Sequence, residues 1–214
     1  MASPFRSARL IYRAAEPTED EAFFLALQQD PIAWVNSNAG IPKPQVKRDA
    51  LRYIRYLEEA LLGVVICLPP TEANGKPNPI GAIALKPVLA SMVQHRSTEI
   101  GINIVTAYQG QGYGGEAINW ILEWAFETAG LHRVSVQHFE YNEGAGRLYE
   151  RLGFKVEGVI REELWHKGRC FDMLMEDSEE IARFSISKDE QYKRPHLLQA
   201  LSVAKAWPVQ VTEL

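Results

Sequence analysis

The spacing of apolar residues in the first sixty positions predicts one short strand followed by two helices. Residues 9–13 have the composition of a strand, whereas residues 18–29 and 46–62 place apolar side chains at helical intervals. The first helix is expected to begin with a capping box, in which Thr18 and Glu21 bind free amides of the first turn.

Breaker residues interrupt and follow these helices. Residues 31–45 carry prolines and a glycine and are expected to form a loop, and Gly63 is expected to end the second helix. The pattern then changes to β runs separated by two further helices. The expected strands are 64–68, 80–86, 98–105, 133–137, 159–166 and 169–176, and the expected helices are 116–128 and 143–152. This order predicts an α/β (α+β) domain with a mixed sheet.

Composition and charge narrow the class of protein. The chain has 214 residues, 46% apolar and 23% charged, with a formal charge of −4, which excludes a disordered chain and a coiled coil. The slightly acidic balance predicts no nucleic-acid partner, and no apolar run approaches the ~20 residues of a membrane span. Cys67 and Cys170 make no disulfide framework, and no Cys/His spacing resembles a metal site. We therefore expect a cytoplasmic protein that holds no metal and enters no membrane.

A glycine-rich segment, residues 109–115, separates a predicted strand from a predicted helix. Glycines let backbone amides approach a ligand, and a helix N-terminus carries about half a positive charge, so the segment predicts a phosphate or pyrophosphate site. The glycines at 110, 112 and 115 also match the dinucleotide fingerprint. That fingerprint follows its strand directly and has an acidic residue ~20 positions later. Here residues 106–109 intervene, and the next strand gives Gln137 and His138, with Glu140 only at its far end. An NAD(P)-dependent oxidoreductase is therefore disfavoured, and a turn without a ligand remains an alternative.

A second motif lies about thirty residues downstream. Residues 142–154 fit the pattern Asn-x-x-Ala-x-x-Leu-Tyr-x-x-x-Gly-Phe. Together with Gln109-x-x-Gly112-x-Gly114, this pair of motifs resembles the GNAT N-acetyltransferase superfamily. The glycine segment corresponds to the acetyl-CoA pyrophosphate loop of that family, and the second motif to the helix that follows.

Flanking residues refine the resemblance. Residues 99–101, Glu-Ile-Gly, and the segment 158–172 look most like the branch of ribosomal-protein alanine acetyltransferases, which is called RimJ/RimL-like. The resemblance implies a GNAT domain over residues 1–176. Residues 177–214 are then an extension, expected to be a docked helix or the contact of a homodimer.

The resemblance also implies the cofactor and its site. The central sheet would be mixed and mostly antiparallel with flanking helices, and the parallel strands 98–105 and 133–137 would splay apart around acetyl-CoA. Strand backbone would bind the pantetheine arm, loop amides would hold the pyrophosphate, and Asn142, which equally suits a helix N-cap, would bind the arm. The implied cofactor-binding residues are Ile104, Val105, Gln109, Gly110, Gln111, Gly112, Tyr113, Gly114, Gly115, Asn142 and Tyr149.

Two residues are candidates for the chemistry. An amine must be neutral to attack a thioester, and a departing sulfur benefits from a nearby neutral acid. Tyr149 matches the tyrosine that family members use as that acid, and its phenol stays protonated at neutral pH. Glu99 lies where some members keep a catalytic glutamate, with ordered water as the alternative base. Without a ligand, Tyr149 would be a core residue and Glu99 an exposed strand carboxylate.

The acceptor is less defined by the sequence. Trp34, Asn36, Glu99 and Trp165 are the candidate substrate-binding residues. The acceptors considered are a small primary amine, an amino acid or a protein N-terminus. A catalytically silent acyl-CoA-binding scaffold that has kept the fold is the alternative function.

Overall fold

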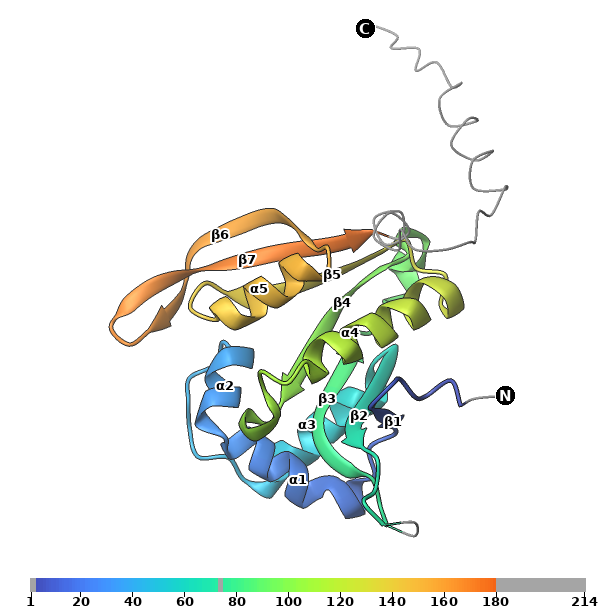
Figure 1. Cartoon of the computed structure of the whole chain (residues 1–214). Helices are drawn as coiled ribbons and strands as arrows, with labels where there is room; N and C mark the ends of the chain where they lie inside the picture. Colours follow the sequence, from blue (N-terminus) through green and yellow to red (C-terminus); the bar gives the residue numbers. More distant parts are fainter. Residues whose placement is uncertain (1–2, 73–74, 180–214) are drawn as a thin grey trace, which may run out of the picture.

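Seven strands form a single sheet in the computed structural model, which describes residues 3–72 and 75–179 (Figure 1). The strand order is β1-β2-β3-β4-β5-β7-β6. Adjacent strands are antiparallel except for β4 and β5, which are parallel. The strands are β1 Ile11–Arg13, β2 Leu62–Leu68, β3 Asn78–Leu85, β4 Ser97–Ile104, β5 Arg133–Phe139, β6 Lys155–His166 and β7 Arg169–Glu179. The predicted mixed, mostly antiparallel sheet is confirmed.

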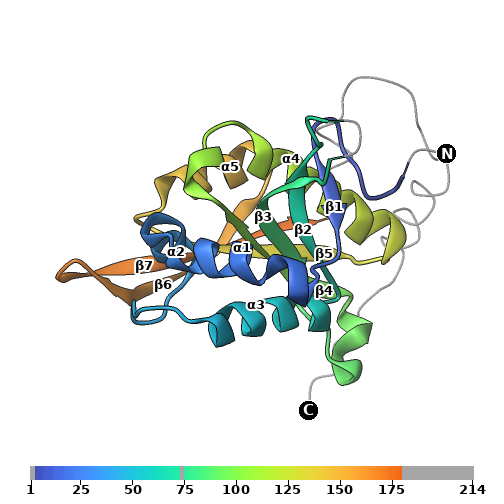
Figure 2. The same ribbon diagram turned by 90° about the horizontal axis from the view of Figure 1, so that it is seen from below.

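Helices cover both faces of this sheet (Figures 1 and 2). On one face α1, α2 and α3 pack against Val65, Cys67 and Ala82. On the other face α4 and α5 pack against residues such as Ile66 and Val136. Successive strand residues thus enter opposite cores, which explains the nearly continuous apolar runs of the central strands. The helices are α1 Pro17–Gln29, α2 Pro31–Ser37, α3 Lys47–Glu59, α4 Tyr113–Glu123 and α5 Glu143–Arg151.

Three short helical segments complete the described chain. They are η1 Ala90–His95, η2 Thr106–Tyr108 and the π-helix η3 Trp124–Thr128. The helix predicted over residues 116–128 is therefore α4 and η3 together, and it begins three residues earlier than expected. The earlier start matters for the site, because it brings the helix N-terminus into the glycine segment.

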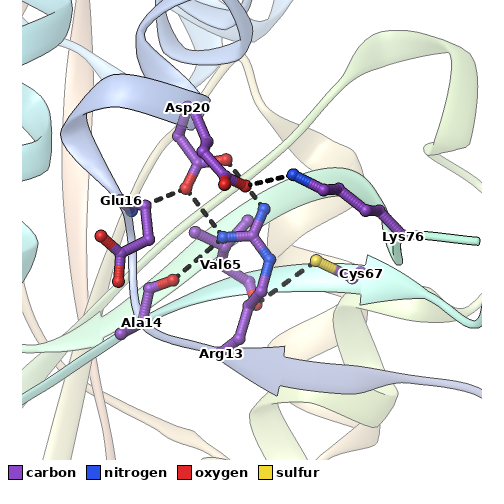
Figure 3. A network of polar contacts seen from close by, with 8 residues as sticks. Arg13, Ala14, Glu16, Asp20, Val65, Cys67 and Lys76 are labelled. Carbon is purple, nitrogen blue, oxygen red and sulfur yellow. Dashed lines mark hydrogen bonds and ion pairs between the residues drawn. The ribbon is translucent and has the colours of Figure 1, made fainter.

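The start of α1 is held by an ion pair rather than by the predicted capping box. Asp20 accepts two hydrogen bonds from Arg13 of β1, at 2.7 and 2.8 Å, and a third from the Glu16 amide at 2.8 Å (Figure 3). The side chain of Glu16, the N-cap residue, makes no capping hydrogen bond, and Asp20 instead of Glu21 binds the Glu16 amide, so the prediction for Thr18 and Glu21 is wrong. Asp20 is 2% exposed, and a buried carboxylate requires partners of this kind.

Residues 31–45 are only partly a loop, because residues 31–37 form α2. The Asp30 side chain accepts hydrogen bonds from the amides of Ile32 and Ala33, each at 3.0 Å, and Pro31 occupies the first helical position. An Asp-Pro pair that ends one helix can therefore begin the next, since aspartate is a favoured N-cap and proline suits the first turn.

Gly63 lies inside β2 rather than at the end of α3, which finishes at Glu59. A Cβ at position 63 would lie 2.2 Å from the carbonyl oxygen of Leu57. The glycine therefore permits the close approach of α3 to β2, and it does not act as a helix stop.

The hairpin of β6 and β7 extends beyond the predicted domain boundary. Asp177 and Ser178 belong to β7 and pair with Ser135 and Val134 of β5. The docked helix or dimer contact predicted in the extension falls on residues 180–214, which lie outside the described residues. Within the described ranges, no helix is long and apolar enough to cross a membrane.

We predict that Asp20→Asn destabilises the protein by about 2 kcal/mol at pH 7, because it leaves Arg13 with a weaker partner. Burial alone would raise the pKa of Asp20, but the hydrogen bonds from Arg13 and Glu16 outweigh it and hold the pKa below its usual value. The stabilisation is thus present above the ordinary aspartate pKa of about 3.9 and is lost as the pH falls through the lower folded-state value.

Urea unfolding of both proteins at pH 7 and at progressively lower pH measures the difference. The difference in unfolding free energy between the two proteins should narrow only below about pH 4. The control is Glu19→Gln, which removes an exposed pair with Lys76 and should change stability by less than about 0.5 kcal/mol. An equal loss in the two variants would contradict the prediction.

Candidate active site

The parallel strands β4 and β5 part in the middle of the sheet. Their register runs from Ser97 opposite Arg133 to Ile100 opposite Val136 and stops there. Beyond this point β4 continues along β3 to Ile104, while β5 continues along β7. The predicted splayed pair is confirmed, and the gap between the strands opens toward the glycine segment.

Backbone groups of β4 face this gap. The Val105 amide donates to the carbonyl of Ile80 at 2.9 Å, so it is directed toward β3. Because bonding direction alternates along an antiparallel strand, the backbone groups of Ile102 and Ile104 point the other way, into the gap. The carbonyl of Ile104 accepts a hydrogen bond from the Gln109 side chain at 2.8 Å. Of the two strand residues predicted to bind the cofactor, Ile104 directs its backbone groups into the gap, whereas the Val105 amide does not. Ile102, which was not predicted, also directs its backbone groups into the gap.

The glycine segment leads from the end of β4 into α4. Gly110 and Gly112 have φ angles of 72° and 83°, a region that favours glycine. Gly112 is the N-cap of α4, and no side chain of the described residues caps that end. The first amides of α4 are consequently available to an anion, and the helix dipole adds a favourable potential there.

Arg9, from the segment before β1, clamps this loop. Its Nε donates to Glu116 at 2.7 Å and its Nη1 to the carbonyl of Gln111 at 3.1 Å, while its guanidinium lies 4.6 Å from the Tyr113 ring centroid. Burial would raise the pKa of Glu116, but hydrogen bonds from Ser7 and Arg9 outweigh it and keep the carboxylate ionised. Sequence reasoning missed Arg9, because it lies about a hundred residues from the loop.

A first cavity of about 480 Å³ lies along the glycine segment, α5 and α2. Its lining includes most of the residues that the sequence assigned to the cofactor, but not Val105, Gln111 or Tyr113. Those that line it are Ile104, Gln109, Gly110, Gly112, Gly114, Gly115, Asn142 and Tyr149. Gln111 and Tyr113 instead contact Arg9, which places them in the support of the loop.

Asn142 connects α5 with α2. Its side-chain oxygen accepts a hydrogen bond from the Ala145 amide at 3.3 Å, which makes it the N-cap of α5. Its Nδ2 donates to the carbonyl of Asn36 at 3.2 Å. Asn142 is therefore the N-cap of α5, as the sequence allowed. It also lines the first cavity and a second cavity beside it.

A second cavity of about 340 Å³ lies against the first. Trp34, Tyr53 and Tyr56 contribute aromatic surface to it, and Lys86 and Glu99 face each other across an ion pair of 2.6 Å. The residues that line both cavities are Asn36, Ser37, Ile102, Asn103, Asn142 and Tyr149.

Three of the four candidate acceptor residues line the second cavity, and Trp165 lines neither cavity. Trp165 is 73% exposed on the β6–β7 hairpin, where it pairs with Cys170 near the turn. Because the hairpin is long, Trp165 near its turn lies away from the gap. The sequence indicated the turn at Lys167 and Gly168, but it did not indicate where the hairpin places Trp165.

Tyr149 occupies the boundary between the two cavities. It is 5% exposed, and burial raises the pKa of its phenol, with a further rise from the charge of Glu176. The phenol is therefore protonated at neutral pH and available as a hydrogen donor. Within residues 3–72 and 75–179, no group of three or more His, Cys, Asp or Glu side chains could hold a metal ion.

Comparisons with known proteins find similar acetyltransferases. Spermidine N(1)-acetyltransferase of Vibrio cholerae is 37% identical over 79 residues, which are 37% of this chain and 46% of that protein. The uncharacterized N-acetyltransferase YoaA of Bacillus subtilis is 33% identical over 79 residues, which are 37% of this chain and 45% of that protein. The chain thus matches slightly under half of the length of these two relatives.

The fold has solved counterparts as well. The crystal structure of spermidine N-acetyltransferase from Vibrio cholerae in complex with CoA and spermine superimposes with a TM-score of 0.68 and 25% identity, covering 83% of this chain and 99% of that one. The family model described as the acetyltransferase (GNAT) domain matches residues 9–155. With its splayed strands, glycine segment and two joined cavities, this chain belongs to the GNAT acetyltransferase family.

Proposed function

We propose that this protein transfers the acetyl group of acetyl-CoA to a primary amine by direct attack in a ternary complex. The observation that carries the proposal is the meeting of the two cavities at Tyr149, beside the gap between β4 and β5. The first cavity would hold the cofactor and the second the acceptor, so that the two reacting groups meet where the cavities share their lining residues. The Glu99-Ile100-Gly101 sequence supports placement in the RimJ/RimL-like branch, and a cytoplasmic location remains a prediction.

The first cavity suits acetyl-CoA, which supplies the thioester. Backbone groups of Ile102 and Ile104 would bind the amides of the pantetheine arm in the manner of an added strand. The amides of residues 112–115 would bind the pyrophosphate at the N-terminus of α4. Arg147 and Arg151 line the same cavity and would add positive charge near the phosphates.

Two side chains would move protons. Tyr149 would donate its phenolic proton to the departing sulfur, and Glu99 would accept the proton that the acceptor ammonium must lose. Glu99 lies 2.6 Å from Lys86 and lines the second cavity, where its carboxylate could hold an acceptor ammonium in place. Ordered water remains the alternative proton acceptor.

The charge of the second cavity narrows the acceptor. Lys86 and Glu99 are its charged lining residues, and they offset each other. A polyamine would require several carboxylates, whereas amide side chains such as Asn36 and Gln28, beside aromatic walls, suit an amine of low net charge. We therefore propose an amino acid or a peptide amino terminus, rather than a polyamine, as the acceptor.

A thiol-release assay tests the proposal. The protein is mixed with acetyl-CoA and a panel containing amino acids, short peptides, simple amines and spermidine, and free CoA thiol is followed. Release with amino acids or peptides is expected. Tight CoA binding without release for any amine would favour the acyl-CoA-binding scaffold.

Tyr149→Phe should lower kcat by about a hundredfold with little change in the KM for acetyl-CoA, because it removes the proton donor and keeps the ring. Steady-state thiol release measures both constants. The control is Tyr113→Phe, whose ring lies against Arg9 and lines neither cavity, and which should retain turnover. Unaltered turnover in Tyr149→Phe would remove the acid role.

Arg9→Ala should raise the KM for acetyl-CoA by about tenfold and leave kcat within about twofold, since the loop loses its clamp while Tyr149 is untouched. Arg6→Ala, an exposed arginine of the same segment, is the matched control. A lower kcat at unchanged KM would show that Arg9 acts on the chemistry instead of on the loop.

Lys86→Ala should shift acceptor preference toward cations by about fivefold, because Glu99 then has no basic partner in the cavity. The quantity measured is kcat/KM for spermidine relative to that for an active amino acid or peptide. Arg55→Ala, which removes an exposed pair with Glu59 on the outer surface of α3, should leave the ratio unchanged.

A further inference from the structure

Two buried titratable side chains lie behind Tyr149 and have no role in the chemistry described above. His138 of β5 is 7% exposed and Glu176 of β7 is 3% exposed. Their Nδ1 and Oε1 atoms are 2.9 Å apart. Glu176 is directly opposite Val136 in the sheet, so it shares with His138 the face that α5 covers.

This pair contacts Tyr149 through the imidazole. The rings of His138 and Tyr149 meet edge to face, with centroids 5.8 Å apart, and both residues line the second cavity. Gly146 of α5 lies above the imidazole, and a Cβ there would be 2.8 Å from its Nε2. The helix therefore leaves room for a histidine at this position and holds its ring against the phenol.

The electrostatic setting of the pair is unusual for a core. Burial lowers the pKa of His138, and burial together with the charge of Glu150 raises the pKa of Glu176 to about 7. Although Nδ1 is within hydrogen-bond distance of Glu176, its N–H direction is not aligned with the carboxylate. Buried polar groups left in this state cost stability, and proteins keep such groups chiefly at functional sites.

The charged and titratable neighbours of the pair are few. On α5, the Tyr149 ring contacts His138, and the charge of the exposed Glu150 acts on Glu176. The charge of Glu176 acts in turn on Tyr149. Asp177, the next residue of β7, points to the opposite face, where it pairs with Arg133 at 3.0 Å. The charge of Glu176 thus acts on the phenol of Tyr149, and its carboxylate lies 2.9 Å from the imidazole of His138.

We propose that His138 and Glu176 are positioning residues for Tyr149, which fix the orientation of its phenol and, through the charge of the carboxylate, control its release of a proton. The proposal rests on the proposed role of Tyr149 as the acid. An ionised Glu176 disfavours the phenolate and slows proton release, whereas a protonated Glu176 does not. Turnover limited by this step should therefore weaken as the pH rises through about 7.

The experiment compares kcat of the native protein with that of Glu176→Gln between pH 6 and 8.5, with the same saturating amine. Ionisation of the amine affects both proteins equally, so it cancels in the ratio of the two kcat values. The ratio of native to variant should fall by about threefold to tenfold as the pH rises through 7. A ratio that is independent of pH would overturn the proposal.

Two surface variants keep the test valid if Glu176→Gln folds poorly. Glu150→Gln removes the exposed charge that raises the pKa of Glu176. The fall in kcat that accompanies ionisation of Glu176 should therefore persist in this variant and move to lower pH. Glu123→Gln, which removes an exposed carboxylate on α4, should leave the pH of this fall in kcat unchanged. A fall in kcat that stays at the same pH in Glu150→Gln would contradict the assignment to Glu176.

A spectroscopic readout separates this inference from the proposed function. The imidazole NMR signal of His138, identified by its loss in His138→Gln, should shift near pH 7 in the native protein and not in Glu176→Gln. This measurement requires no turnover. A signal without that shift in an active enzyme would overturn the inference alone. An absence of acetyl transfer to any amine would overturn the proposed function, and this inference with it.

Discussion

Between Ile100 and Ile104, β4 keeps its hydrogen bonds to β3 and loses its partner in β5. Everything in the site depends on this separation. It turns two backbone positions toward open space, creates room for a cofactor arm, and places the end of β4 next to the N-terminus of α4. A sheet tolerates unpaired backbone groups at its centre only if something else binds them, since their desolvation is costly. The unpaired backbone groups of the gap are therefore available to a ligand or to water.

Two arginines near the start of the chain stabilise the surroundings of that gap from opposite faces of the sheet. Arg13 joins β1 to the start of α1 through Asp20, on the face of the sheet that α1, α2 and α3 cover. Arg9 joins the segment before β1 to Glu116 and Gln111, which holds the glycine segment in place. Tyr12 lies between them and stacks on Trp120 of α4, with ring centroids 3.7 Å apart. Residues 9–13 thus contact the glycine segment, α4 and the start of α1.

The sequence was sufficient for the fold class, the glycine segment and the position of Tyr149, because each of these leaves a local pattern. Periodicity marks strands and helices, glycines mark a loop that approaches a ligand, and a motif of thirteen residues places the tyrosine on α5. The first turn of α1 was not predictable in the same way, because the partner of Asp20 is an arginine from another element. The distance of Trp165 from the cavities depends on the hairpin as a whole, which no local pattern encodes.

The clamp of Arg9 on the glycine segment has a consequence for the order in which the protein folds. Glu116 and Arg9 are separated by 107 positions, so closing this contact requires a large loss of chain entropy before any stabilisation is gained. Contacts of such high sequence separation form slowly, and they tend to follow the local helices and hairpins. The glycine segment should accordingly be among the last regions to reach its final geometry, after the sheet and α4 have already assembled.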